Sequence, residues 1–504
     1  MKAPAVLLAL LSIHTLEAAS FSQNVQPPIG RDFNGNIAAV GNFMAAAGGG
    51  RVHFYERNGG VWEIFQRKPF LTTPAANGGG FGTRILMPDR NTLLVSDPSF
   101  DAPTPTGGTN SDQGAVFVFG RDVGGDNNWG LIRQITATDH QLPNANLSKR
   151  LGEVMAVDDG RLVVSATAGT AIGNPKFFYV FEMHRGGTNQ WGQVPGAKME
   201  GTAFSGLSFG NAVSISGDLI VASSYLESRQ ATPTSPIESG IGALFFFNRN
   251  EGGADRWGLL PHGRRFAPDA APADFFGHSI SLSGNLLAVG ASGRDLSSTR
   301  QDAGMIYLLE RDRGGADAWG FTSDRLTTPD AAAGDGFGSA VRLQGHLLAG
   351  VSPGDDVAGT NGAGSATLFS GTSGTWTALP AGRFSIDNVP GIVDVGAAND
   401  KGLFLDPQRM FFWSRYSSSG HFWTEIDVSA DFGPVSAGTL LLQPQGSLRF
   451  TPSRSGKYQL RTSGNLITWV DEGPVFSASA QSTIDLTTPF PTGVSRKYFR
   501  IEGR

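Results

Sequence analysis

The stretch FGHSISLSGNLLAVGAS runs from Phe276 to Ser292, and MIYLLERDRGGADAWGF follows from Met305 to Phe321. In the first, apolar and polar residues alternate on both sides of Ser-Gly-Asn, whose Gly and Asn tolerate the positive φ of a hairpin turn. In the second, an aromatic-rich strand, an Arg and a Gly-Gly turn lead to Trp319, which is expected to open a further strand. Together they predict one antiparallel unit of four strands.

Both phrases recur along the chain. Copies of the first begin at Phe81, Leu151, Phe209, Phe276 and Phe337, with looser copies at Phe33 and Ile392. One Trp falls in each unit, at Trp62, Trp129, Trp191, Trp257, Trp319, Trp376 and Trp423. Since four-stranded antiparallel sheets repeated about an axis make a β-propeller, seven such units predict an all-β, seven-bladed β-propeller. The last unit keeps only Met410–Arg415 and Trp423, so a six-bladed ring is the alternative.

The repeated Trp residues allow two interpretations. Each is expected to open the fourth strand of its unit at a nearly constant distance from the next apolar-Gly pair, which predicts packing between neighbouring blades. The alternative is an exposed crown of rings for stacking on sugars.

Loop length varies at one place in the repeat. Only 17 residues separate Phe33 from Gly50, but 33 separate Phe81 from Gly114. The variation falls between the second and third strands, and loops of one type emerge on one face of a propeller. Because lengthening a loop is entropically cheap, the sequence predicts one face with elaborated loops. Removing much of the loop between Ser224 and Gly240 is expected to leave folding intact and to abolish partner capture.

Composition excludes several functions. The 504 residues include 39 Lys and Arg against 44 Asp and Glu, a net charge of −5, which gives no electrostatic footprint for nucleic acid. The absence of Cys excludes disulfides, thiol nucleophiles and thiolate metal sites. Lys2 and the apolar run Ala3–Leu11 predict a signal peptide over residues 1–19, since that run is about half the length of a membrane span. We therefore expect a monomer that does not span the membrane and is secreted, periplasmic or associated with the cell surface.

The recurring Phe-Gly pair, the Gly-Ala step at Gly290-Ala291 and the Gly-led third strand resemble the FG-GAP repeat of integrin α-subunit propellers and their bacterial exported relatives. The resemblance covers residues 20–429 and implies a seven-bladed, extracellular, ligand-recognising propeller. The Pro of the family's Gly-Ala-Pro step appears only as Pro98 and Pro353, in altered contexts. The calcium loop D-x-[DN]-x-[DN]-G of many family members has no match, so we expect no cofactor and carry no calcium dependence over.

A second unit is predicted over residues 430–504, where short alternating runs such as GTLLLQ and KYQLRTS are separated by Gly, Ser and Pro. They predict a small antiparallel β-sandwich. The pattern from Tyr458 to Trp469, with Tyr498-Phe499-Arg500, is similar to a short C-terminal module of exported bacterial proteins.

Charged residues in the long loops are the candidate ligand-binding residues: Asp97, Asp101 and Asp112 in the second unit, Arg294 and Asp295 in the fifth, and Asp355 and Asp356 in the sixth. On a shared face they would form an acidic rim for a cation or a basic partner. The alternative is that they are solvated turn formers.

We expect no catalytic residue and no metal ligand. The match to G-x-S-x-G at 350–354 lies where other repeats read VGAS, opens no helix, and places Pro353 where an oxyanion hole needs an N–H. No two His residues stand at metal-ligand spacing.

The sequence thus predicts a non-enzymatic, exported propeller of the binding or adhesion type. It would recognise a protein or glycan partner, at the cell envelope or outside the cell, through the long loops of one face. The alternative is a polysaccharide-active or polysaccharide-binding enzyme with loop carboxylates as an acid/base pair, which requires two carboxyls from different blades to face each other in a deep central pocket. A third option is a propeller that only spaces or caps other envelope components.

Overall fold

The computed structural model describes most of the repeat region and the strands that follow it. The described residues are 20–25, 33–74, 79–103, 109–136, 150–167, 176–200, 209–230, 234–372, 374–389, 392–395, 403–407, 409–417, 420–428, 438–442, 448–452, 456–463, 470–471, 476–478, 484–486 and 498–503. The predicted signal peptide, residues 1–19, lies outside them. None of these residues is helical, so no described helix is available to cross a membrane.

Seven antiparallel sheets of four or five strands follow one another along the chain and form blades 1 to 7. Blade 1 contains β2 (Phe33–Val40), β3 (Phe43–Gly48), β4 (Arg51–Asn58), β5 (Val61–Ile64) and β6 (Phe70–Thr72); blade 2 contains β7 (Ile85–Asp89), β8 (Thr92–Asp97), β11 (Ala115–Gly120) and β12 (Gly130–Thr136); blade 3 contains β13 (Met155–Asp158), β14 (Arg161–Thr167), β15 (Lys176–Glu182) and β16 (Gly192–Glu200). Blade 4 contains β17 (Val213–Ser216), β18 (Leu219–Ser224), β19 (Ala243–Asn248) and β20 (Gly258–Arg265); blade 5 contains β21 (Phe276–Ser283), β22 (Leu286–Ala291), β23 (Met305–Glu310) and β24 (Gly320–Leu326); blade 6 contains β25 (Ala340–Gln344), β26 (Leu347–Ser352), β27 (Ser365–Ser370) and β28 (Thr377–Ser385). In the loop of blade 2, β9 (Ala102–Pro103) and β10 (Thr109–Asn110) form a separate two-stranded pair.

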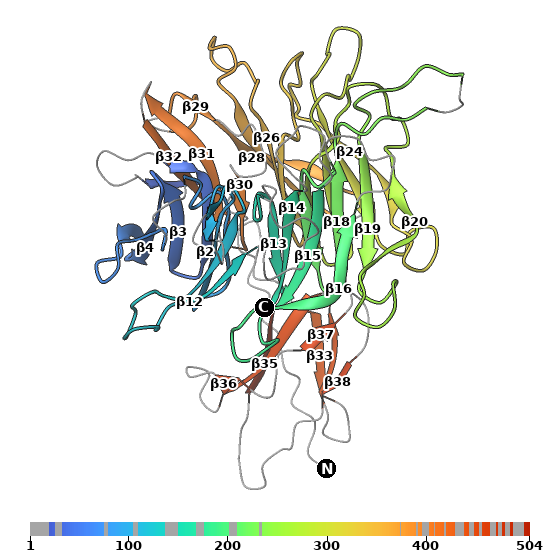
Figure 1. Cartoon of the computed structure of the whole chain (residues 1–504). Coiled ribbons are helices and arrows are strands. Elements are labelled where there is room, and N and C mark those ends of the chain that lie inside the picture. Colours follow the sequence, from blue (N-terminus) through green and yellow to red (C-terminus); the bar gives the residue numbers. More distant parts are fainter. Residues whose placement is uncertain are drawn as a thin grey trace, which may run out of the picture.

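Blade 7 closes the ring with strands from both ends of the repeat region. It contains β29 (Asp394–Val395), β30 (Leu403–Leu405), β31 (Arg409–Ser417) and β32 (Gly420–Asp427), and its outermost strand is β1 (Ser20–Val25). The blades contact one another in order, and β32 of blade 7 contacts β2 of blade 1. In Figure 1 the blue first blade accordingly lies beside the orange last one. The ring therefore has seven blades, as predicted, and not six.

The prediction for Trp423 is wrong in one respect. Trp423 does not open the fourth strand of its blade but lies inside β32, where it pairs with Trp413 on one side and Val25 on the other. The fourth strand comes from Ser20–Val25, a segment that carries none of the repeat's residues. Local pattern could not assign this strand because its partner lies about 400 residues further along the chain.

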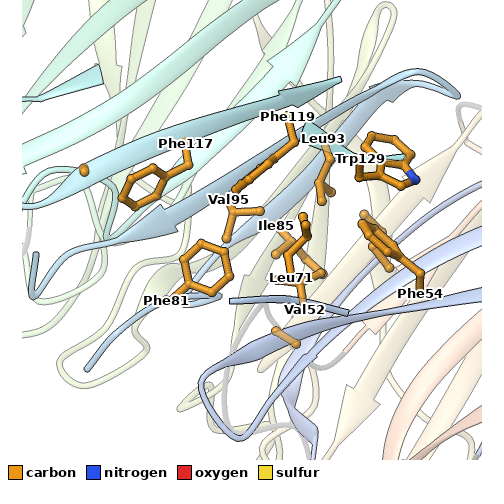
Figure 2. Packing of buried hydrophobic residues seen from close by; sticks show 14 of the residues in the cluster. Val52, Phe54, Leu71, Phe81, Ile85, Leu93, Val95, Phe117, Phe119 and Trp129 are labelled. Atoms are coloured by element: carbon orange, nitrogen blue, oxygen red, sulfur yellow. The ribbon is translucent and has the colours of Figure 1, made fainter. Parts of the chain in front are cut away.

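The core is divided into seven hydrophobic clusters, one at each junction between neighbouring blades. At the junction of blades 1 and 2, the Trp129 ring stacks on Phe43 and Phe54 with centroids 5.5 and 5.1 Å apart. Figure 2 shows Trp129 and Phe54 at one end of this cluster, with Phe81 and Phe117 toward the other end. All seven repeated Trp side chains are at most 7% exposed, which confirms the predicted packing between blades and excludes an exposed stacking crown.

The turns between the third and fourth strands of blades 2, 4 and 5 share one hydrogen-bonding scheme. In blade 5, Asp317 has φ +55°; its N–H donates to Asp312 Oδ1 at 2.7 Å, and its own Oδ1 accepts from Arg311 Nε at 2.7 Å. The corresponding trios are Arg121, Asp122 and Asn127 in blade 2 and Arg249, Asn250 and Asp255 in blade 4. The Arg, Gly-Gly and Trp of the repeat therefore specify one rigid turn, which occurs on the face opposite the long loops.

The strands after the ring form two small antiparallel sheets. One contains β33 (Gly438–Leu442), β34 (Leu448–Pro452) and β38 (Ile484–Leu486); the other contains β35 (Gly456–Ser463), β36 (Val470–Asp471), β37 (Phe476–Ala478) and β39 (Tyr498–Gly503). Figure 1 shows several of these red strands beyond the lower edge of the ring. The side-chain packing between these two sheets lies outside the described part of the structure, so the β-sandwich stays a prediction.

Candidate functional site

The candidate site is the face that carries the loops between second and third strands. Because neighbouring strands of a blade run in opposite directions, these loops share a face with the connections from each fourth strand to the next blade. We call it the long-loop face and define it by the loops 97–115, 224–243, 291–305 and 352–365, together with the connections 265–276 and 326–340. The loops of blades 4 to 6 project from the upper edge of the ring in Figure 1.

Three of the seven predicted residues occupy the same position in their repeats and fix their own loops. Asp101 Oδ1 accepts from the backbone N–H of Asp112 at 2.9 Å. Asp295 Oδ1 accepts from Asp302 at 2.8 Å, and Asp356 Oδ1 accepts from Gly362 at 2.8 Å. Each carboxylate thereby joins the first part of a long loop to its last part. This geometry is that of turn formation, and binding by the same carboxylates stays a prediction.

Asp97 ends β8 beneath the loop of blade 2 and is fully buried. Its Oδ1 accepts from the N–H groups of Gly80 and Ser99 at 3.0 and 3.2 Å, while its Oδ2 has no partner among the described residues. Burial raises the pKa of Asp97, the two backbone hydrogen bonds oppose that rise, and the charges of Asp101 and Asp112 add to it. The structure therefore brings the three predicted carboxylates of blade 2 into one electrostatic group.

Arg294 lies in an ion-pair group at the junction of blades 4 and 5. Its Nη1 donates to Asp274 Oδ2 at 2.8 Å and its Nη2 donates to Asp269 Oδ2 at 3.0 Å. Asp274 is buried; desolvation raises the pKa of its carboxyl, and Arg294 and the N–H of Ala271 counteract part of that rise. Sequence reasoning missed both acids, although Asp274 stands two residues before the Phe-Gly pair, as Asp335 does in the next repeat.

Asp355 is buried under the loop of blade 6 and pairs with Arg383, whose Nη2 lies 2.7 Å from its Oδ2. Ser365 Oγ donates to the same carboxylate. In blade 4 the equivalent positions hold Glu227 and Arg264, which form the same kind of pair. The sequence feature that could have predicted this pairing is an Arg in the fourth strand, Arg264 or Arg383. No local motif shows that this Arg contacts the loop.

The seven predicted residues thus fall into three groups, on blades 2, 5 and 6. Within the described ranges no three His, Asp or Glu side chains are arranged to hold a metal ion. Two hollows lie elsewhere. One, of about 470 Å³, is lined by Phe70, Phe119 and Trp129 at the junction of blades 1 and 2, and the other, of about 630 Å³, by Arg161, His184 and Arg185 at the turns of blade 3.

Fold and repeat together define the class of this protein: it is a seven-bladed β-propeller. The FG-GAP repeat family matches residues 265–309, which span β21 and β22 and most of β23, so this segment is similar to an FG-GAP repeat. The sequence matches no curated protein.

Three solved structures are similar to this chain at low identity. One is described as a variant of S. cerevisiae dbp5 bound to nup159, a gle1 variant, IP6 and ADP; the matched chain has 10% identity and a TM-score of 0.38, covering 82% of this chain and 96% of that one. The second is a Pseudomonas aeruginosa periplasmic gluconolactonase, with 11% identity and a TM-score of 0.34, covering 94% and 99%. The third is a hypothetical selenium-binding protein from Sulfolobus tokodaii, with 11% identity and a TM-score of 0.39, covering 94% and 97%. Similarity at this level does not bear on function.

Proposed function

We propose that this protein is an exported, non-enzymatic binding propeller that recognises a protein or glycan partner through its long-loop face. The observation that carries the proposal is the contrast between the two faces. The opposite face repeats one turn scheme in blades 2, 4 and 5, whereas the long loops differ in length and, apart from the shared capping carboxylate of blades 2, 5 and 6 and the acid–Arg pair of blades 4 and 6, in sequence. Variation confined to one side of a rigid ring is how binding loops are commonly presented.

The bonding of the loop carboxylates supports binding over catalysis. Asp101, Asp295 and Asp356 accept backbone N–H groups, and Asp274 and Asp355 are paired with Arg294 and Arg383. A general acid and base need carboxyls that are free to exchange protons with a substrate. The hollows of blades 1 to 3 are lined by none of these acids.

Export is part of the proposal because of Lys2 and the apolar run at Ala3–Leu11, and the absence of Cys is compatible with it. A protein without thiols needs neither a reducing nor an oxidising compartment to keep its fold.

The absence of Cys also provides a direct test. We expect Ile237→Cys, on the long-loop face where the side chain is 62% exposed, and Val123→Cys, on the opposite face where it is 39% exposed, each to accept a single maleimide–polyethylene glycol chain. The two conjugates are then compared with the unlabelled protein on a glycan array and on an array of purified extracellular protein domains. Binding should be lost with the polymer at position 237 and kept with the polymer at position 123.

Equal binding by both conjugates would place recognition away from the long-loop face. If the unlabelled protein binds nothing on either array, a spacer or cap becomes the better description of the ring.

A further inference from the structure

A group of half-buried rings lies on the long-loop face at the junction of blades 4 and 5. Tyr225 directly follows β18, Phe275 directly precedes β21, and His278 lies near the start of β21. The Tyr225 ring is 5.9 Å from Phe275 in an edge-to-face arrangement and 5.3 Å from His278. His278 Nδ1 is 2.9 Å from Ser292 Oγ, at the end of β22. Aromatic rings and hydroxyl-bonded polar groups are therefore gathered at one point of the face.

The backbone at Phe275 is strained. Its φ is +54°, and Ala273 two residues earlier has φ +63°. A bulky side chain in the left-handed region is a conformational outlier, and such outliers persist where the surroundings hold them for a function. The same position before the Phe-Gly pair of blade 6 is Gly336, with φ +64°, so that repeat reaches the conformation without strain. An aromatic ring thus stands where blade 6 has a glycine, at a position where Arg150 of blade 3 also has a positive φ, of +45°.

Two glycines make room for this ring. A Cβ at Gly293 would lie 2.7 Å from Phe275 Cδ2, and a Cβ at Gly240 would lie 3.1 Å from Phe275 Cε1. The backbone is held as well, because Phe275 N–H donates to Gly240 O at 2.9 Å and Phe275 O accepts from His278 N–H at 3.0 Å. The ring is consequently fixed in position before any ligand arrives, which lowers the entropic cost of binding.

The charges around the rings are paired. Arg294 is bound to Asp269 and Asp274. Two further ion pairs in this part of the face are Arg229 with Glu238 and Arg264 with Glu227. Because each of these cations already has an anion beside it, none of them is free to bind an anionic ligand. Aromatic rings beside hydroxyl and imidazole groups suit a molecule with an apolar face and a rim of hydroxyls.

We propose that Tyr225, Phe275 and His278 form a stacking platform for a pyranose ring of a neutral glycan, with the His278–Ser292 pair exchanging hydrogen bonds with its hydroxyls. The proposal rests on the proposed function and names the ligand class of the same face. It also explains why the strained aromatic occurs in blade 5 and not in blade 6.

The test uses the full chain and four neutral hexasaccharides, cellohexaose, mannohexaose, xylohexaose and chitohexaose, in calorimetric titrations. We expect at least one of them to bind. Phe275→Gly copies blade 6 and removes the strain together with the ring, so we expect a Tm within about 4 °C of the original and a dissociation constant raised about tenfold or more. Tyr225→Ala should weaken binding to a similar extent, and Tyr225→Phe, which keeps the ring, should weaken it less.

Phe70→Ala is the matched control, because Phe70 is another half-buried ring but belongs to blade 1. It should leave the dissociation constant unchanged. Tetramethylammonium serves as the probe for a cation bound by the rings, and it should not compete with the hexasaccharide.

Three results would overturn the platform: no binding of any of the four hexasaccharides, unchanged binding by Phe275→Gly, or displacement of the sugar by tetramethylammonium. None of them removes the proposed function, because a protein partner blocked by the polymer at position 237 would still place recognition on the long-loop face.

Discussion

The two faces of the ring use the same repeat in different ways. The face opposite the long loops, which carries the turns between third and fourth strands, is the turn face. On it, blades 2, 4 and 5 each hold an Arg, an Asx and a Gly-Gly pair in the same hydrogen bonds, and the Trp that follows packs on the preceding blade. On the long-loop face, blades 5 and 6 share a capping carboxylate, Asp295 and Asp356, but the residue before it is Arg294 in blade 5 and the buried Asp355, paired with Arg383, in blade 6. The turn face is therefore part of what folds the ring, and the other face is where the sequence is free to vary.

The largest difference in stability is expected between shortening a side chain at a blade junction and shortening one on the long-loop face. Trp257→Ala removes a ring that is 4% exposed from the junction of blades 3 and 4, and should lower the free energy of unfolding by about 3 to 5 kcal/mol. Ile237→Ala, on the long-loop face, should leave it unchanged because that side chain is mostly exposed. Chemical denaturation of both variants measures the difference. A small effect for Trp257→Ala would mean that the junctions do not depend on the repeated Trp.

A second, smaller effect on stability is expected from replacing one acid on each face, Asp335 on the long-loop face and Asp317 on the turn face. Desolvation, with the charges of Asp355, Asp330 and Asp356, raises the pKa of Asp335. The unfolded chain therefore loses this proton at a lower pH than the folded chain, and ionisation of Asp335 opposes folding at neutral pH. Asp335→Asn should raise Tm near pH 7, and the gain should shrink as the pH falls through the raised pKa toward about pH 4.

The matched control for this change is Asp317→Asn, because Asn127 already performs the role of Asp317 in blade 2. Its Tm should differ little from that of the original protein at either pH. A lower Tm for Asp335→Asn at neutral pH would show that the long-loop face needs the ionised carboxylate.

A still smaller effect is expected inside the turn face. Blade 3 has Met183 where blades 2, 4 and 5 have the turn Arg, and its turn still forms, with His184 Nδ1 accepting from Asn189 N–H. Arg311→Met copies blade 3. Since Arg311 is 40% exposed, the change should lower the free energy of unfolding by no more than about 1 kcal/mol. A loss comparable to that of Trp257→Ala would show that the ion pair, and not the backbone, holds the turn.

The smallest effect on stability is expected from shortening a long loop. Arg229 and Glu238 pair across the base of the loop of blade 4, so replacing residues 230–237 by Asn-Gly should change the free energy of unfolding by less than about 1 kcal/mol. The larger deletion expected from sequence to leave folding intact, between Ser224 and Gly240, would instead remove the buried Glu227 and the carbonyl of Ser239, which accepts from Ala273 N–H. Thermal melts of the two deletions distinguish the dispensable tip from the structural base.

Sequence predicted the features that repeat. The hairpin pattern and the spacing of Trp indicated seven blades, and the variable interval indicated the face with long loops, because each follows from local periodicity. It could not predict β1 as the last strand of the ring, since pairing with Asp427 depends on closure of the whole circle. It also missed the Asp355–Arg383 pair and the Phe275 group, since both depend on which loops the fold brings together.

Closure by β1 has a mechanical consequence. Ser20 pairs with Asp427, so the chain enters and leaves the ring at the same end of one antiparallel strand pair. Tension applied through residues 20 and 427 would load the backbone hydrogen bonds of β1 and β32 one after another, as in opening a zipper, while the other six blades carry no force. The β1–β32 pair would therefore separate first under tension, and it would pair again when the tension is released.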